Sequence, residues 1–373
     1  MLCFPISKQG DGNITLRQVK KYPIKGLAGV DLDRVELMAE RGIAGDRKFA
    51  ITTNADLDDS VWHSLRNFLI NAINDGLLQL DLHWSGSKLH VSMPDGKQKC
   101  FDLDSRGGLD AFNHSLPALL SNTASSGLVP RLVGATGSMA PPGFWDYSDS
   151  QVSVMNLETL RAVSNAIGED LDIDRFRGNL IIDGQPAWSE FGFAGSRFAF
   201  GDAEVEFTRP ARRCPATAVN PTTGIRDIPV NSLIVEKFGH GYFGMYARVV
   251  KTGALGIGDS LNQAGASVLA PNDVMVQGAG PSALWPKLAV LDDIYRSKDI
   301  VRLSLAPVGP WPLVDEPREG SLKLHLGSQN TVATKTIQQI SGEIRAEVSG
   351  ENLDSIRSLS VGDRIVVTGP YGR

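Results

Sequence analysis

The sequence predicts a mainly β protein with some α-helix, built from two or three domains. Short runs of alternating apolar and polar residues recur between Gly and Pro residues, a pattern typical of strands joined by tight turns. The chain has 373 residues, which is more than one compact hydrophobic core usually serves. Its composition, with 42% hydrophobic and 21% charged residues, is that of an ordinary globular protein.

The first part of the chain, residues 1–140, is expected to combine short strands with two helices. Strand-like runs occupy residues 14–16, 35–38, 48–51, 78–82 and 88–92. Apolar residues recur at helical spacing between Val61 and Ile73, so a helix is expected over residues 61–74. A second helix is expected over residues 110–120. The run Pro94-Asp95-Gly96-Lys97 predicts a hairpin turn.

The rest of the chain is expected to form a second domain over residues 141–265 and a module over residues 277–373. Gly- and Pro-rich or aromatic-poor stretches at 134–150 and 262–275 mark the expected boundaries. Asn156 is a suitable cap for a helix over residues 157–167. Strand-like runs at 180–182, 197–200 and 204–207 favour a β-barrel over a doubly wound sheet. Further runs at 300–305, 322–326 and 364–367 predict a β-rich last module.

Charge and cysteine content exclude several classes of protein. A formal net charge of -5 argues against a general binder of nucleic acids or anionic membranes. The three cysteines, Cys3, Cys100 and Cys214, contain no CxxC pair, which disfavours a Cys-rich zinc site or a four-Cys iron–sulfur cluster. No signal peptide or membrane-spanning apolar run is recognisable, so a cytoplasmic location is expected, with Cys214 as a free thiol.

The stretch from Arg209 to Gly224 is the most informative part of the sequence. Arg212 and Arg213 directly precede Cys214, and adjacent positive charge favours a thiolate. A thiolate is both a nucleophile and a soft metal ligand. The alternative is a small buried cysteine beside two surface arginines. The following Asn-Pro-Thr-Thr-Gly run, which ends at Gly224, predicts a turn that fixes this loop.

Motifs along most of the chain resemble those of MOSC domain proteins that carry the MOSC N-terminal β-barrel. Arg213-Cys214 followed by Thr217-Ala218-Val219-Asn220-Pro221-Thr222-Thr223-Gly224 resembles the central motif, with Asn220 in place of the usual Asp. Other matching runs, in the family's order, are Tyr22–Gly26, Gly42–Arg47, Arg175–Asn179, Pro186–Glu190, Phe243–Tyr246 and Gly253–Asp259. In architecture the chain is similar to the mitochondrial amidoxime-reducing component and its bacterial relatives.

The resemblance implies a molybdenum–molybdopterin cofactor, with Cys214 as molybdenum ligand and catalytic residue. Its terminal phosphate requires positive side chains and backbone donors. The matching positions are Lys25, Gly26, Arg47, Asp149, Ser150, Arg177, Arg212, Arg213 and Tyr246. The cofactor would lie between the first two domains. The implied activity, independent of pyridoxal phosphate, is reduction of small N-hydroxylated compounds with electrons from a flavoprotein or ferredoxin-type partner.

Two other functions remain open at this point. In a sulfur-carrier or cofactor-maturation protein, Cys214 would carry a persulfide instead of metal. A non-catalytic carrier of the molybdenum cofactor is the third possibility. Lys25 and Arg47 could be solvated charges, Tyr246 a packed aromatic, and His240 either a proton donor or a surface or capping residue.

Some positions are ambiguous or depart from the family's pattern. By alternation in an extended segment, one of Arg175 and Arg177 would bind phosphate while the other pairs with Asp172 or Asp174. Gly26 replaces a Ser, Gly178 replaces a Pro, and Pro215 directly follows the cysteine. These changes put the substrate in doubt more than the cofactor.

The last module lies outside the MOSC resemblance. Residues 360–372 resemble the strand and Gly-Pro turn that end the flavin-binding barrel of ferredoxin-reductase-like proteins. The Arg-x-Tyr-Ser flavin motif of that family is not found. A β-barrel or docking module is therefore expected over residues 277–373 in preference to a flavin site.

Overall fold

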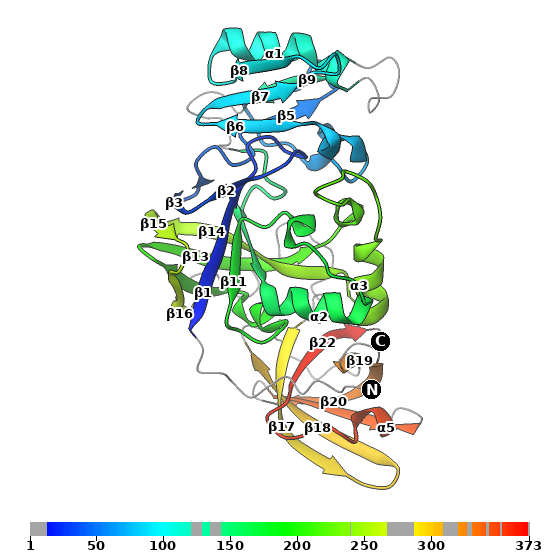
Figure 1. Ribbon diagram of the computed structural model, residues 1–373. Coiled ribbons are helices and arrows are strands. Elements are labelled where there is room, and N and C mark those ends of the chain that lie inside the picture. Colours follow the sequence, from blue (N-terminus) through cyan, green and yellow to red (C-terminus); the bar gives the residue numbers. More distant parts are fainter. Residues whose placement is uncertain are drawn as a thin grey trace.

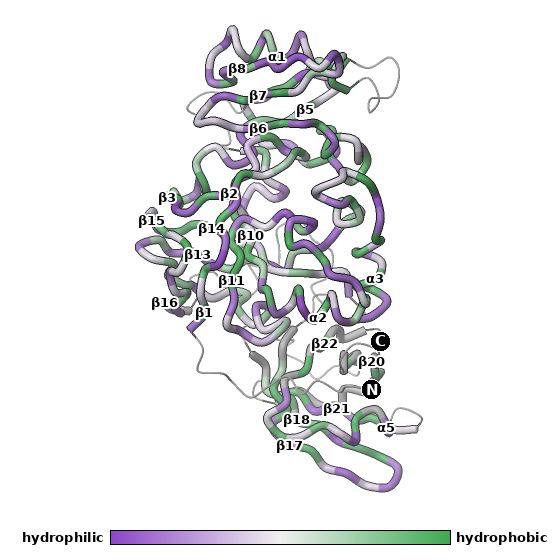
Figure 2. Tube along the Cα trace, in the orientation of Figure 1, coloured by the Kyte–Doolittle hydropathy of each residue, from purple (hydrophilic) through white to green (hydrophobic). Residues whose placement is uncertain are grey.

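The computed structural model describes residues 13–120, 129–134, 143–238, 240–266, 287–308, 320–326, 330–340, 343–350 and 353–371. Strands predominate among these residues and a few helices accompany them, which confirms the predicted mainly β class with some α-helix. The elements fall into three parts that lie one above another in Figure 1. Hydrophobic segments recur in each part, consistent with separate hydrophobic clusters (Figure 2).

The central part is a closed β-barrel, as the sequence predicts. Its strands pair in the order β11 (Leu180–Asp183), β10 (Val152–Asn156), β14 (Tyr242–Lys251), β13 (Ala203–Arg212), β12 (Ser196–Phe200), β16 (Ser260–Ala266) and β1 (Ile14–Lys21). Pairing of β1 with β11 closes the ring, and β2 (Val30–Leu32) extends it beside β1. Buried side chains such as Leu16, Val205 and Phe207 form its core.

Strand β1 comes from the first 21 residues, yet it completes a barrel formed mostly by residues after 150. A second small sheet also crosses the expected boundary at residue 140. It pairs β3 (Arg34–Met38) with β4 (Gly42–Ile43) and with β15 (Gly253–Gly256). The division into residues 1–140 and 141–265 stays a prediction. The expected boundary stretches lie largely outside the described residues.

Helices and short 3₁₀ turns connect the barrel strands. These are α2 (Leu157–Ile167), α3 (Val230–Phe238), η3 (Ile173–Phe176), η4 (Ser189–Phe193) and η5 (Pro215–Ala218). Helix α2 begins as predicted, because the Asn156 side chain accepts a hydrogen bond from the Glu158 N–H. It ends at Gly168, whose left-handed conformation is typical of a helix C-terminus.

The part at the top of Figure 1 consists of small sheets and one long helix. Its elements are β5 (Phe49–Thr52) paired with β9 (Arg131–Gly134), the hairpin sheet β6 (Leu82–Ser85), β7 (Lys88–Ser92) and β8 (Gln98–Asp102), α1 (Arg106–Leu119), η1 (Leu65–Asn67) and η2 (Asp75–Gln79). The described strands here do not close into the expected barrel-like ring. Helix α1 covers the apolar side chains of the sheet instead, with Phe112 packed edge-on against Phe101.

The predicted helix over residues 61–74 is wrong. Only a 3₁₀ turn, η1, forms within this range. The apolar residues at helical spacing do not share a buried face, since Phe68 is buried whereas Val61, Leu65 and Ile73 are exposed. The segment packs through individual side chains, and helical periodicity therefore gave the wrong answer.

The last part is a second closed barrel, consistent with the expected β-rich module. Its strands pair in the order β17 (Lys287–Arg296), β18 (Ile300–Val308), β21 (Glu343–Ser349), β20 (Asn330–Ile340), β19 (Gly320–Leu326) and β22 (Arg364–Tyr371). Short helix α5 (Leu353–Ile356) precedes β22. Buried Leu291, Leu303, Leu324 and Val367 fill its interior. Within the described residues, no helix is long and apolar enough to cross a membrane.

Candidate functional site

Cys214 lies on the surface, just beyond the end of barrel strand β13. It precedes η5, and Thr217 folds back onto it by donating from its backbone N–H and its hydroxyl to the Cys214 carbonyl, at 3.2 and 3.1 Å. The side chain is exposed and the thiol is free. The alternative of a small buried cysteine is therefore wrong, and the free thiol expected from the sequence is confirmed.

Arg213 supplies a half-buried positive charge beside this thiol. Its guanidinium donates to the carbonyl oxygens of Phe243 and Phe176 at 2.8 and 2.9 Å, and to the sulfur of Met155. It forms no ion pair with a carboxylate among the described residues. Burial lowers the pKa of Arg213, while the nearby Tyr246 and Cys214 side chains act in the opposite direction. A thiolate at position 214 would therefore face an uncompensated cation.

Lys25 and Tyr246 meet at the carboxylate of Asp146, which the sequence did not single out. The Lys25 ammonium donates to Asp146 Oδ1 at 2.5 Å and to the Phe144 carbonyl at 2.9 Å. The Tyr246 hydroxyl donates to Asp146 Oδ2 at 3.1 Å. Burial favours the neutral carboxylic acid, but Lys25 and Arg47 outweigh it and hold the pKa of Asp146 well below its usual range. Lys25 is thus buried and paired with a half-buried carboxylate, and the solvated-charge alternative is wrong for it.

Arg47 and Arg177 both lie against the ring of Tyr22. Their guanidinium carbons are 4.9 and 4.4 Å from the ring centroid. Both residues have left-handed backbones, with φ of 51° and 53°, which is uncommon for a residue other than Gly. Arg47 also donates to the Arg177 carbonyl at 3.3 Å and pairs with buried Asp46. Backbones of this kind persist where surrounding contacts hold them, often at functional sites.

Arg177 differs from Arg47 because it has no carboxylate partner. No hydrogen bond or ion pair of its guanidinium occurs among the described residues. Burial lowers the pKa of Arg177, and the neighbouring charge of Arg47 lowers it further. A half-buried cation without a counterion is costly unless an anion binds there. Among the cationic side chains Lys25, Arg47, Arg177 and Arg213, here called the cationic cluster, the geometry therefore favours Arg177 as the one that binds an anion.

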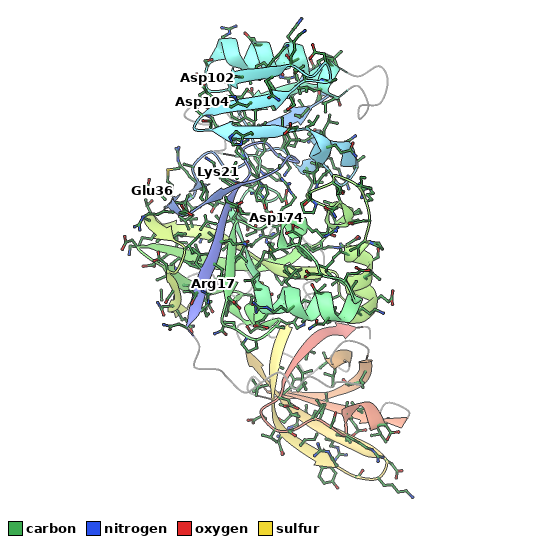
Figure 3. The ribbon with its side chains drawn as sticks, in the orientation of Figure 1. Arg17, Lys21, Glu36, Asp102, Asp104 and Asp174 are labelled. Carbon is green, nitrogen blue, oxygen red and sulfur yellow. The ribbon has the colours of Figure 1, made fainter. Side chains whose placement is uncertain are left out.

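The structure separates Arg175 from Arg177 in a way that alternation in a strand did not predict. Residues 173–176 form the turn η3, and Arg177 follows as its left-handed end. Arg175 makes a two-pronged ion pair with Asp227, at 2.7 Å for each contact. Asp174, which is labelled in Figure 3, pairs with Lys20 at 2.6 Å. The expected pairing of an arginine with Asp172 or Asp174 is wrong.

Three predicted cofactor residues have other partners than the cationic cluster among the described residues. Asp149 pairs with Arg209, whose guanidinium lies over Tyr147, and the Tyr147 ring packs edge-on against Tyr246. Buried Ser150 shares a hydrogen bond with Thr208 at 2.8 Å. Arg212 is exposed at the end of β13. The roles assigned to Asp149, Ser150 and Arg212 remain predictions.

The two glycines that depart from the family's motifs fit their surroundings closely. Gly26 has φ of 86°, and a Cβ there would lie 3.0 Å from the Leu69 carbonyl oxygen. A Cβ at Gly178 would lie 2.4 Å from the side chain of Met155. Both positions therefore favour glycine for reasons of packing.

His240 is buried rather than at the surface. Its ring packs edge-on against Trp188 and Phe191, with centroids 5.1 and 5.7 Å apart. Its Nδ1 accepts a hydrogen bond from the Tyr242 N–H at 3.3 Å. These contacts give His240 a packing role beside the start of β14.

Glu190 is a buried carboxyl group, and the sequence did not predict that its pKa would be shifted. Its oxygens accept from Asn156 at 3.0 Å and from Thr159 at 2.8 and 2.9 Å. Burial raises the pKa of Glu190 from 4.5 to about 7, even though these hydrogen bonds act in the opposite direction. Between these pH values the folded protein keeps a proton that the unfolded chain loses, so stability falls as pH rises through this range.

We therefore expect Glu190→Gln to reduce the pH dependence of stability. The wild type should lose about 3 kcal/mol of unfolding free energy from this group between pH 4.5 and 8. The variant should unfold at a higher denaturant concentration than the wild type at pH 8, and at a similar one at pH 4.5. Urea titrations at both pH values test this, with Glu158→Gln, at a partly exposed carboxylate, as control. An equal change of unfolding free energy with pH in Glu190→Gln and in the wild type would contradict this prediction.

Part of the chain matches the model of a known protein family. Residues 124–262 match the family model described as MOSC domain. Proteins named molybdenum cofactor sulfurase from Drosophila mojavensis and Drosophila grimshawi are 23% and 26% identical over 248 and 254 residues. Each alignment covers 62% of this chain and 31% of the relative, so the chain aligns with about a third of the length of these relatives.

Among solved structures, YiiM from Geobacillus stearothermophilus has a TM-score of 0.25 and 20% identity, covering 31% of this chain and 54% of that one. The family match rests on the segment that includes β10 to β15 and the loop of Cys214. The match to the MOSC domain thus covers residues 124–262 of the chain, the segment that carries Cys214.

Proposed function

We propose that this site binds a molybdenum–pterin cofactor through Cys214 and reduces small N-hydroxylated compounds with electrons from a partner protein. One observation carries the proposal: an exposed free thiol stands beside a half-buried arginine, Arg213, that has no carboxylate partner among the described residues. A soft anionic sulfur stabilised by a fixed cation suits a metal ligand. The MOSC match and the names of the curated relatives support a function connected with the molybdenum cofactor.

The charges around the thiol fit an anionic cofactor. The positive side chains of the site are Lys25, Arg47, Arg177 and Arg213, and the carboxylates of the site are Asp46 and Asp146. Four cations against two carboxylates leave an excess of two positive charges, which a phosphate would neutralise. Arg177 would hold that phosphate, since Arg47 and Lys25 already have carboxylate partners. When bound, the cofactor would supply two-electron oxygen-transfer chemistry.

Asp146 and Tyr246 would orient this pocket rather than transfer protons. Burial raises the pKa of Tyr246 well above its usual value of 10, and the charge of Asp146 raises it further. The Tyr246 hydroxyl therefore keeps its proton at neutral pH and donates to Asp146. Asp146 stays ionised and fixes the Lys25 ammonium, so the position of this cation depends on it.

A second candidate function is sulfur transfer, in which Cys214 carries a persulfide. The curated relatives are named molybdenum cofactor sulfurase, which favours this alternative. The exposure of the thiol is compatible with it, because a sulfur carrier must reach both its donor and its acceptor. A non-catalytic carrier of the cofactor would need the same pocket without turnover.

Metal analysis of the full chain separates these functions. Protein purified from a host that makes the cofactor should contain about one molybdenum per chain, the stoichiometry of a single thiolate ligand. It should also oxidise a reduced viologen dye in the presence of an amidoxime. Absence of molybdenum together with cyanide-labile sulfur on Cys214 would establish the sulfur carrier instead. Molybdenum without turnover of amidoximes or hydroxylamines would establish the carrier.

A further inference from the structure

The hairpin sheet of β6, β7 and β8 places two histidines and a cysteine side by side, one on each strand. His83 of β6 lies directly opposite His90 of β7, and His90 lies directly opposite Cys100 of β8. Residues that oppose each other in an antiparallel sheet project from the same face, with Cβ atoms about 5 Å apart. These three side chains, here called the His-His-Cys row, are all of types that bind transition metals.

The His-His-Cys row lies on the face of the sheet that helix α1 leaves open. On the other face, Phe101 of β8 packs edge-on against Phe112 of α1, with ring centroids 5.2 Å apart. Successive residues of a strand point to opposite faces, so Cys100 points away from this helix. His83 and Cys100 are exposed, and His90 is half-buried. An ion can therefore reach all three side chains from solvent.

His90 and Cys100 are spaced like two ligands of one zinc ion. The Nε2 atom of His90 lies 3.7 Å from the Sγ atom of Cys100. With a Zn–N distance of about 2.0 Å and a Zn–S distance of about 2.3 Å, two ligands of a tetrahedral zinc ion lie about 3.6 Å from each other. The observed spacing therefore suits an ion bound by both atoms, with almost no change in their separation.

His83 is near enough to supply a third ligand. The ring centroids of His83 and His90 are 6.2 Å apart. Two imidazole rings on one tetrahedral zinc ion have centroids about 5 Å apart, given a Zn–N distance of about 2 Å. Among the described residues, no three metal-ligating side chains already converge on one point. His83 therefore has to turn toward His90 when the ion binds, and its exposure to solvent allows this movement.

The charged side chains on the same face of the sheet favour a cation. Asp81 accepts a hydrogen bond from the Ser92 hydroxyl, and Asp102 lies opposite Lys88. Asp102, which is labelled in Figure 3, is two residues after Cys100 on β8 and therefore lies on the same face. These two carboxylates against one ammonium leave an excess of one negative charge beside the His-His-Cys row.

We propose that His83, His90 and Cys100 form a zinc-binding site on the open face of the sheet of β6, β7 and β8. Imidazole nitrogen and thiolate sulfur are the ligands that zinc takes most often in proteins, and water completes the tetrahedral coordination here. Binding forms a Zn–S bond, and the Cys100 thiol releases its proton to solvent. No electron is transferred, so the site needs no oxidant or reductant. The inference does not depend on the proposed function of Cys214.

Protection of Cys100 from alkylation by zinc tests the site. The full chain, purified from a host that makes no molybdenum cofactor and freed of metal with a chelator, reacts with iodoacetamide over a range of zinc sulfate concentrations at one pH. Peptide mass spectrometry follows Cys100 and the other exposed thiol, Cys214, in the same molecule. Saturating zinc should slow Cys100 labelling at least about tenfold, because the metal-bound sulfur is withheld from the reagent. Labelling of Cys214, which stands beside Arg213, should not change.

Histidine variants show which side chains hold the ion. His90→Ala and His83→Ala should each raise the zinc concentration that half-protects Cys100 at least about tenfold, because each removes one ligand. His114→Ala is the matched control, since His114 is an exposed histidine of α1 and lies outside the His-His-Cys row. It should leave the half-protecting zinc concentration unchanged.

Cobalt gives a second readout that does not use alkylation. Co²⁺ added to the metal-free chain should produce a thiolate-to-cobalt charge-transfer absorption that Cys214→Ser retains and Cys100→Ser loses. Equal zinc protection of Cys100 and Cys214 would overturn the site, because zinc would then associate with any exposed thiol. An unchanged half-protecting concentration in either His83→Ala or His90→Ala would overturn it as well. None of these readouts uses molybdenum content or turnover, so failure of this inference and failure of the proposed function are distinguishable.

Discussion

Cys214→Ser is expected to remove molybdenum from the purified protein almost completely. The substitution keeps the size of the side chain but replaces a soft, readily ionised sulfur with a hydroxyl that stays protonated at neutral pH. Loss of even an outer partner of a metal site commonly costs tenfold to a hundredfold in metal affinity, so loss of the ligand should reduce bound molybdenum at least about tenfold. Inductively coupled plasma mass spectrometry on the full chain measures it.

The fold should not change in this variant, because the Cys214 side chain is exposed and only its carbonyl bonds to Thr217. The melting temperature in the absence of cofactor should match that of the wild type. Cys100→Ser is the matched control, since Cys100 is also an exposed free thiol, and its sulfur lies 3.7 Å from His90 Nε2. Molybdenum retained in Cys214→Ser, or lost equally in Cys100→Ser, would show that another residue holds the metal.

Local features of the fold could be read from the sequence because they depend on neighbouring residues. The cap at Asn156, the hairpin turn at Gly96 and the strands of the barrel all follow from short-range patterns. Closure of the barrel could not be read in this way. Strand β1 pairs with β11 and β16, more than 150 residues away, and no local pattern in residues 14–21 identifies these partners.

The candidate site shows the same limit. Cys214 stood out because its neighbours form a recognisable run, whereas Asp146 lies in a Gly- and Pro-rich loop without a distinguishing pattern. Its importance comes from Lys25 and Tyr246, which approach it from positions about a hundred residues away on either side.

Arg175 and Arg177 provide the sharpest test of the anion site, because two neighbouring arginines should respond in opposite ways. Arg177 has no carboxylate partner among the described residues, so Arg177→Met removes a costly half-buried charge and should not lower the melting temperature of the cofactor-free protein. Arg175→Met breaks a two-pronged pair with the partly exposed Asp227 and should cost about 2 kcal/mol of unfolding free energy.

Cofactor binding should also distinguish the two variants, but here Arg177→Met should be the more strongly affected. Charged hydrogen bonds contribute about 1.5–3 kcal/mol, so Arg177→Met should weaken binding of the pterin phosphate by about tenfold to a hundredfold. Molybdopterin per chain, measured by fluorescence after oxidation, reports this loss. Inorganic phosphate should raise the melting temperature of the cofactor-free wild type and of Arg175→Met, but not of Arg177→Met. Phosphate stabilisation that survives in Arg177→Met would place the anion site elsewhere, because stability gained from a ligand requires its binding residues to be intact.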